Sequence, residues 1–228
     1  MFDLKGLDKR LIILTLLICA IGLCCLYSAS YNKSIEMNRS FVMRQALWMA
    51  VGIVISFLVL FIDYQRLIDL GFVFYGAGLL MLGLVLVIGH ARLGSQRWIS
   101  IGGFNLQPSE FNKIIYVIMM ASYLGGARAR IVNIRGLAVP FLLTIPPFFL
   151  ILIQPDLGTA LVLMPVLLAM LFVAGARGKH LLSIIAAGAV ASPFFWHFLK
   201  EYQKKRLLVF LNPDADPLGA GYTIIQSK

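Results

Sequence analysis

Long apolar runs without charged residues dominate this chain and decide what it can fold into. Each is close to the ~20 residues that a helix needs to cross the hydrocarbon of a bilayer. The runs cover residues 11–32, 45–62, 70–89, 136–155, 157–176 and 181–199. A soluble chain of 228 residues that is 60% hydrophobic and 13% charged could not bury so much apolar surface. Because lipid offers no hydrogen-bond partners to an open backbone, the spans must be helices.

The runs predict an all-α fold, a polytopic membrane helix bundle with seven transmembrane helices. A shorter run at 114–127 completes the set if 107–113 joins it. The expected spans are 10–30, 42–62, 68–89, 107–125, 136–153, 157–175 and 180–199. Residues 1–228 then form a single membrane domain. Residues 200–228 are basic and turn-rich and indicate the start of a large external loop, so we expect the domain to be incomplete at its C-terminus.

The net charge of +10 is explained by membrane topology rather than by nucleic-acid binding. Basic residues cluster in the short links between spans, as the positive-inside rule expects. The richer side holds Lys5, Lys9, Arg10, Arg66, Arg128, Arg130, Arg135, Arg177 and Lys179. This distribution places the N-terminus in the cytoplasm.

Two stretches join Gln-Pro to an acid inside apolar sequence: LQPSEFNK at 106–113 and IQPDLGT at 153–159. With a cytoplasmic N-terminus, both lie at the outer face, where one span begins and two others meet. We therefore expect Gln107 and Gln154, with their neighbouring charges, to belong to one site.

The charges of these stretches are Glu110, Lys113 and Asp156. Glu110 and Lys113 are three residues apart and share one helix face. Asp156 suits a helix N-cap, and Glu110 suits a helix N-terminus. Lys113 has no such explanation, since a lysine in the first turns opposes the helix dipole and a charge in hydrocarbon costs about 2.5–3.5 kcal/mol. We expect a polar cavity that opens outward, in which Lys113 meets Glu110 along its helix and Asp156 across helices.

Arg97 and Trp98 lie in the outer link before this cavity. Trp98 alone is typical of an interfacial anchor. The guanidinium of Arg97 matches phosphate oxygens, so the pair is also a candidate for binding a lipid phosphate.

Three motifs resemble those of the SEDS family (shape, elongation, division and sporulation). RLGSQRWISIGGFNLQPSEFNK at 92–113 and LIQPDLGTALVL at 152–163 are similar to its two signatures. RLLVFLNPDADPLGAGYTIIQSK at 206–228 resembles the start of its large extracellular loop, in a form closer to the RodA branch than to the FtsW branch. The resemblance covers the whole chain.

The resemblance implies an inverting glycosyltransferase that polymerises lipid II, and so binds undecaprenyl-linked glycan, at the outer face of the bacterial cytoplasmic membrane during elongation. It implies ten membrane helices, a class B penicillin-binding protein as partner and a divalent cation (Mg or Mn), to which we assign no ligands. Glu110, Lys113 and Asp156 match polar positions of the family's central cavity. Arg97 and Trp98 match its outer-loop motif, and we assign substrate or phosphate binding to them and to Gln107 and Gln154.

One departure limits the expectation. The family's catalytic aspartate lies in a His-Thr-Asp-Phe-like motif farther along the large loop, and residues 1–228 contain no such motif. We therefore name no catalytic residue here, place the expected aspartate beyond Lys228, and expect this chain alone to be inactive.

Two other functions stay open from the residues alone. A transporter or lipid flippase also carries proline-broken helices and intramembrane charges. A non-catalytic membrane scaffold for cell-wall synthesis would need only the helices. The role of Lys113, structural or chemical, is open as well.

Overall fold

The computed structural model describes residues 8–31, 35–92, 95–101 and 104–197, with isolated positions beyond 200. It divides the chain into two units, 1–66 and 67–228, each of which is described by itself. The start of an external loop predicted for residues 200–228 falls outside the described residues, apart from those isolated positions.

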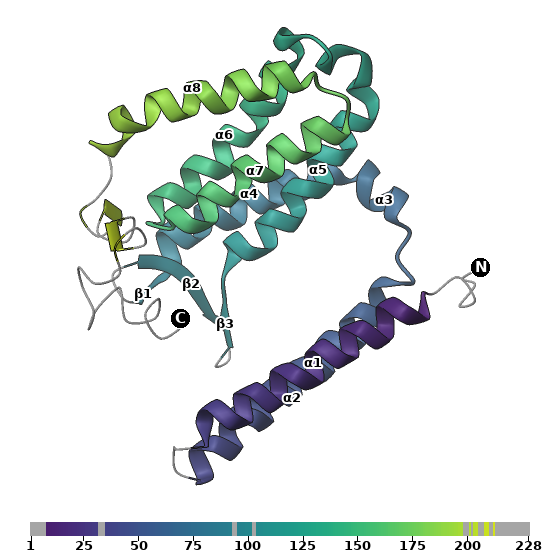
Figure 1. The fold of residues 1–228 in the computed structure, drawn as a ribbon, viewed down its shortest axis with the longest axis vertical. Coiled ribbons are helices and arrows are strands. Elements are labelled where there is room, and N and C mark those ends of the chain that lie inside the picture. Colours follow the sequence, from purple (N-terminus) through teal and green to yellow (C-terminus); the bar gives the residue numbers. More distant parts are fainter. Residues whose placement is uncertain are drawn as a thin grey trace. The chain divides into compact units, whose positions relative to one another are not determined.

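The first unit is a helical hairpin of α1 (Lys9–Ser30) and α2 (Ile35–Val59), shown in Figure 1. Asp8 starts α1 as its N-cap, because its Oδ1 accepts from the backbone N–H groups of Arg10 at 2.9 Å and Leu11 at 3.4 Å. Most described side chains of the two helices are apolar and exposed, as expected for helices whose surroundings are lipid.

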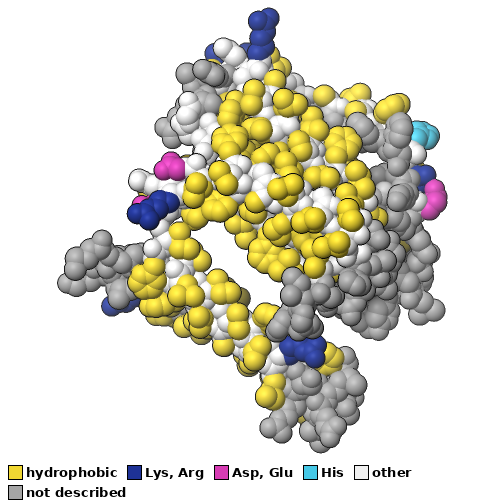
Figure 2. All heavy atoms as spheres, turned by 180° about the vertical axis from the view of Figure 1, so that it is seen from behind, with side chains coloured by type: hydrophobic (Ala, Val, Ile, Leu, Met, Phe, Trp, Pro, Cys, Tyr) yellow, Lys and Arg dark blue, Asp and Glu magenta, His cyan; other side chains and the backbone are white. Residues whose placement is uncertain are grey.

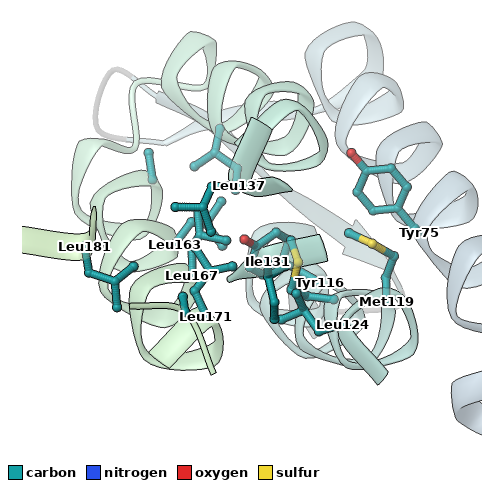
Figure 3. Packing of buried hydrophobic residues seen from close by; sticks show 14 of the residues in the cluster. Tyr75, Tyr116, Met119, Leu124, Ile131, Leu137, Leu163, Leu167, Leu171 and Leu181 are labelled. Atoms are coloured by element: carbon teal, nitrogen blue, oxygen red, sulfur yellow. The ribbon is translucent and has the colours of Figure 1, made fainter. Parts of the chain in front are cut away.

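The second unit packs five long helices around one apolar core (Figure 1). After the short α3 (Tyr64–Asp69) come α4 (Gly71–Ile88), α5 (Pro108–Ile131), the 3-10 turn η2 (Ile134–Leu137), α6 (Ala138–Ile153), α7 (Leu157–Val173) and α8 (Gly178–Trp196). Helix α4 packs on α5 and α6, and α7 packs on α5, α6 and α8. In Figure 3, Leu163, Leu167 and Leu171 of α7 form one buried stripe at i, i+4 spacing that faces Tyr116 and Leu124 of α5.

The seven predicted spans correspond to α1, α2, α4, α5, α6, α7 and α8. Among the described residues, four segments are long and apolar enough to cross a membrane by length and composition. These are Lys9–Ser30, Phe41–Val59, Gly71–Ile88 and Ile134–Ile153, and Leu157–Val173 is a shorter apolar helix. Helix α5 runs on to Ile131, past the predicted end at residue 125. Figure 2 shows hydrophobic side chains over most of the visible described surface, with charges near its margins.

The link between α4 and α5 is a small antiparallel sheet that was not predicted from the sequence. Strands β1 (His90–Arg92), β2 (Ser95–Ile101) and β3 (Phe104–Leu106) pair in the order β1-β2-β3. His90 is opposite Trp98, and Ile99 is opposite Leu106. The glycines and serines of this link are typical of an irregular connection, although RWISI has the alternation of polar and apolar residues that indicates a strand. The sheet contacts α4 and α5 through β2.

Helix α6 continues through Pro146 and Pro147. Pro147 has no N–H to donate to the carbonyl of Leu143 four residues earlier, and the hydroxyl of Tyr75 on α4 donates to that carbonyl at 2.6 Å. The bond replaces the missing helical hydrogen bond and ties α6 to α4.

In helix α8, a carbonyl freed by proline is satisfied by a side chain of the same helix. Pro193 frees the carbonyl of Ala189, and the hydroxyl of Ser192 donates to it at 2.8 Å. Pro147 and Pro193 therefore each leave a carbonyl that a nearby hydroxyl group satisfies.

Candidate functional site

The two Gln-Pro stretches meet at one end of the second unit. Gln107, between β3 and α5, donates its Nε2 to Oδ2 of Asp156 at 3.0 Å and to Oγ of Ser109 at 3.1 Å. Asp156 begins α7 directly after the turn that ends α6. Residues 106–113 and 153–159 therefore lie side by side, as expected from the sequence.

Asp156 is the centre of this cluster, which consists of Arg97, Gln107, Ser109, Asp156 and Thr159 and is called the Asp156 cluster below. Its Oδ1 lies 3.3 Å from Nη1 of Arg97 and accepts from the backbone N–H of Thr159 at 3.3 Å. Its Oδ2 accepts from Gln107 and from the hydroxyl of Thr159 at 3.0 Å. The expected N-cap role is therefore present together with an ion pair.

The ion pair connects the sheet to the helices. Arg97 projects from β2, and the side chains of Arg97 and Asp156 are only 18% and 8% exposed. A buried carboxylate needs such partners, because removing an unpaired charge from water costs several kcal/mol. Trp98 follows on β2 and is partly buried, and successive strand residues point to opposite faces, so Arg97 alone of the pair reaches Asp156.

Lys113 and Glu110 form a separate pair, with Nζ of Lys113 2.9 Å from Oε2 of Glu110. The prediction that Lys113 also meets Asp156 is wrong for the described residues, in which the ion pair of Asp156 is with Arg97. The helix explains why: Ser109, Asn112 and Tyr116 form the buried face of α5, and at 100° per residue Lys113 lies at the border of that face and Glu110 beyond it. Accordingly, their side chains are 30% and 52% exposed.

Gln154 is fully buried and points toward α4, where its Nε2 donates to the backbone carbonyl of Leu82 at 2.9 Å. In this structure its described hydrogen bond goes to a helix and not to the Asp156 cluster. The Gln-Pro context of Gln154 predicted a substrate-binding residue, but that context does not reveal whether a side chain is buried.

The N–H of Thr159 was expected as a donor to Asp156, but its hydroxyl and two buried polar residues of α5, Ser109 and Asn112, were missed. Asn112 and Ser109 are 2% and 0% exposed. A usable signal did exist, because Thr159 is three residues after the N-cap Asp156, where its N–H and hydroxyl can both reach the capping carboxylate. Ser109 and Asn112 are three apart and so share a helix face.

A divalent cation does not fit the described side chains as a resident group. No cluster of three or more His, Cys, Asp or Glu residues occurs among the described positions. The two carboxylate oxygens of Asp156 already take four contacts, about as many as a carboxylate can accept.

The chemistry that remains is ionic and hydrogen-bonding. One guanidinium on the central strand of the sheet is oriented by a carboxylate, and a separate lysine–glutamate pair lies on the neighbouring helix surface. Such an arrangement can orient cations toward an anionic ligand at this end of the bundle.

Comparisons with known proteins agree with the motifs. The family model of FtsW, RodA and SpoVE, described as cell cycle proteins, matches residues 9–228. The chain is 37% identical over 235 residues to a probable peptidoglycan glycosyltransferase FtsW of Trichlorobacter lovleyi, which covers 100% of this chain and 61% of that protein. It is 36% identical to stage V sporulation protein E of Bacillus subtilis, covering 96% of this chain and 62% of that protein.

Two solved structures are similar in fold. A chain of a peptidoglycan synthase complex, in which polymerization and crosslinking are coordinated, gives a TM-score of 0.82 at 37% identity, covering 97% of this chain and 64% of that one. The rod shape determining protein RodA of Thermus thermophilus gives 0.68 at 34% identity, covering 81% and 59%. The present chain spans about three-fifths of the length of the curated relatives it matches.

Proposed function

The chain belongs to the FtsW/RodA/SpoVE family of cell cycle proteins, the SEDS family, and from this premise we propose that the protein it forms is a peptidoglycan glycosyltransferase. The proposed reaction joins lipid II units into glycan strands at the outer face of the bacterial cytoplasmic membrane. The N-terminus is then cytoplasmic, and the sheet and the Asp156 cluster lie outside.

The observation that carries the proposal is the Asp156 cluster itself. It brings the two Gln-Pro signatures into direct contact and presents Arg97 at their junction, in a chain 37% identical to a relative named as a peptidoglycan glycosyltransferase. The two family signatures thus together form one polar end on a bundle of apolar helices.

Glycan extension releases a lipid diphosphate, so the site must stabilise negative charge on the departing group. Guanidinium and ammonium groups serve this purpose, and Arg97 and Lys113 are the cations that we assign to it. Each is already oriented by a carboxylate, Asp156 and Glu110 respectively. The general base that takes the proton of the acceptor hydroxyl is assigned to the family aspartate expected beyond Lys228.

The first experiment separates transferase from flippase. Residues 1–228 are joined to the C-terminal part of the Trichlorobacter lovleyi relative, and this extended chain is reconstituted in vesicles with lipid II. Glycan polymer that is lost in Arg97→Ala supports the proposal. The alternative is a flippase, in which proline-interrupted helices also occur. Lipid translocation without polymer would identify it, provided that the intact relative polymerises lipid II in the same preparation.

A finer part of the proposal is the elongation role, supported by the RodA-like form of residues 206–228. The extended chain is expressed in cells depleted of RodA and, separately, in cells depleted of FtsW. Restored rod shape only in the first strain supports elongation. Restored septation only in the second assigns the chain to division instead.

The proposed partner is a class B penicillin-binding protein, supported by the similar chain from a peptidoglycan synthase complex. Co-purification of the extended chain with the class B protein of the same cells is expected. A capture experiment in which the intact relative retains this protein and the extended chain does not would contradict the assignment.

The proposed orientation is tested by labelling single cysteines in intact cells, after Cys19, Cys24 and Cys25 are replaced by alanine. Tyr31→Cys, at the exposed end of α1, is expected to react with a membrane-impermeant thiol reagent. Asn133→Cys, in the exposed link before η2, is expected to react only after the cells are opened. The reverse labelling pattern would show that the protein has the opposite orientation in the membrane.

A further inference from the structure

Asn112 is the most conspicuous polar group of the bundle that the proposed function does not use. It is 2% exposed on the inner face of α5, and neither its Nδ2 nor its Oδ1 has a hydrogen-bond partner among the described protein groups. Buried amides without partners are rare, because the lost hydrogen bonds to water are not replaced. Native proteins satisfy such groups with ordered water where no protein group is in reach.

Ser109 adds a second polar group on the same face. It is fully buried, and its Oγ accepts from Gln107 at 3.1 Å. Among the described residues, no group accepts its own hydroxyl hydrogen. Because residues three apart on a helix have neighbouring side chains, the free hydrogen of Ser109 and the free amide of Asn112 lie within reach of one small bridging molecule.

Gly78 supplies the wall opposite Asn112. A Cβ at this position would lie 3.3 Å from Oδ1 of Asn112 and 3.4 Å from two carbons of Ile115. The missing side chain lets the amide lie against the backbone of α4, and any larger residue would crowd it.

We propose that Ser109 and Asn112 bind a buried water molecule at the α4–α5 interface beside Gly78. The occupant must accept from the Ser109 hydroxyl or the Asn112 Nδ2 and donate to Oδ1, which water does and an alkali cation does not. The water extends the Asp156 cluster inward, from Asp156 through Gln107 and Ser109 to Asn112. It makes one hydrogen-bonded path from the outer end of the bundle into its interior.

The direct test is NMR of the 228-residue chain in nanodiscs with ¹⁵N-labelled asparagine. The Asn112 side-chain amide is assigned by its disappearance in Asn112→Leu. A cross-peak between this amide and water is expected, and its absence from the assigned resonance would overturn the proposal. Gly78→Ala should weaken the cross-peak, whereas Gly83→Ala, whose Cβ would meet nothing within 4 Å, should leave it unchanged.

A thermal measurement gives an independent answer. If Asn112 is hydrated, Asn112→Leu removes hydrogen bonds and lowers the midpoint of thermal unfolding. If the amide is dry, the same change removes an unsatisfied group from an apolar interface and raises the midpoint. A raised midpoint would refute the water site.

Discussion

Nη1 of Arg97 lies 3.3 Å from Oδ1 of Asp156, so that a side chain of strand β2 is fixed to the first residue before α7. The two partners are not equivalent. Without Arg97, Asp156 keeps its bonds from Gln107 and Thr159, whereas without Asp156 the guanidinium loses a carboxylate and α7 loses its N-cap. The contact therefore makes Asp156 the more important member of the pair for stability.

We expect Asp156→Ala to lower the free energy of unfolding by about 3–5 kcal/mol, the range for breaking a buried pair. Arg97→Ala should cost less, and the double variant should cost about as much as Asp156→Ala alone. Unfolding of the purified chain in mixed detergent micelles measures all three. Thr159→Val is the matched control for the cap and should cost about 1 kcal/mol. Strictly additive losses would show that the two side chains are not coupled.

Lys113→Ala should keep the fold. Its partner Glu110 is 52% exposed, and lysine itself is 30% exposed, so the pair resembles surface ion pairs, which contribute at most about 1 kcal/mol. The same unfolding assay, with Lys113→Arg as the charge-retaining control, checks this. A folded Lys113→Ala extended chain that no longer polymerises lipid II would assign the lysine to chemistry. Loss of folding would instead restore the structural role.

Tyr75→Phe should destabilise the protein more than Tyr116→Phe does. The first change leaves the Leu143 carbonyl, freed by Pro147, without its hydroxyl donor and should cost about 1–3 kcal/mol, as for a buried unsatisfied group. The second leaves Thr144 with its bond to the Pro140 carbonyl at 2.7 Å, so about 0.5–1 kcal/mol is expected. Parallel unfolding curves compare them, and equal losses would contradict the compensating role of Tyr75.

Two glycines of α4 should respond in opposite directions to alanine. At Gly71 a Cβ would lie 3.1 Å from the backbone Cα of Met119, so Gly71→Ala forces α4 from α5 at a cost of about 1–3 kcal/mol. At Gly76 nothing lies within 4 Å, and Gly76→Ala should stabilise the helix by about 0.5–1 kcal/mol. Thermal unfolding of both variants is sufficient, and a stabilised Gly71→Ala would show that the helices are not closely packed there.

Six of the seven long helices could be predicted from sequence because each contains one continuous apolar run, and α5 could be predicted by joining residues 107–113 to the shorter run 114–127. Their ends could not, since α5 runs past the predicted boundary at residue 125 to Ile131, and composition changes there before the backbone does. The sheet was missed because its strands are short and separated by glycines, which is the composition of an irregular loop as well.

The site was predictable in its location but not in its pairing. Topology placed both Gln-Pro stretches at one end, and Gln107 does reach Asp156. Which cation pairs with Asp156 depends on how β2 folds back over the helices, and that is a tertiary fact. Sequence spacing favoured Lys113 because it is on a helix close to Glu110, whereas Arg97 arrives from a strand whose path no local pattern specified.

The turn at Asp156 also sets where the bundle can bend. The backbone N–H of Asp156 donates to the carbonyl of Ile151 at the end of α6, and the same residue's carboxylate holds the start of α7. One residue therefore holds the end of α6 and the start of α7, and the two helices should move together as a rigid body. Rotation should cost less at the other end of α7, where Gly175 has a φ of 101° and a Cβ at this position would meet nothing within 4 Å. A pivot placed there would swing α8 while the Asp156 end of the α6–α7 hairpin keeps its shape.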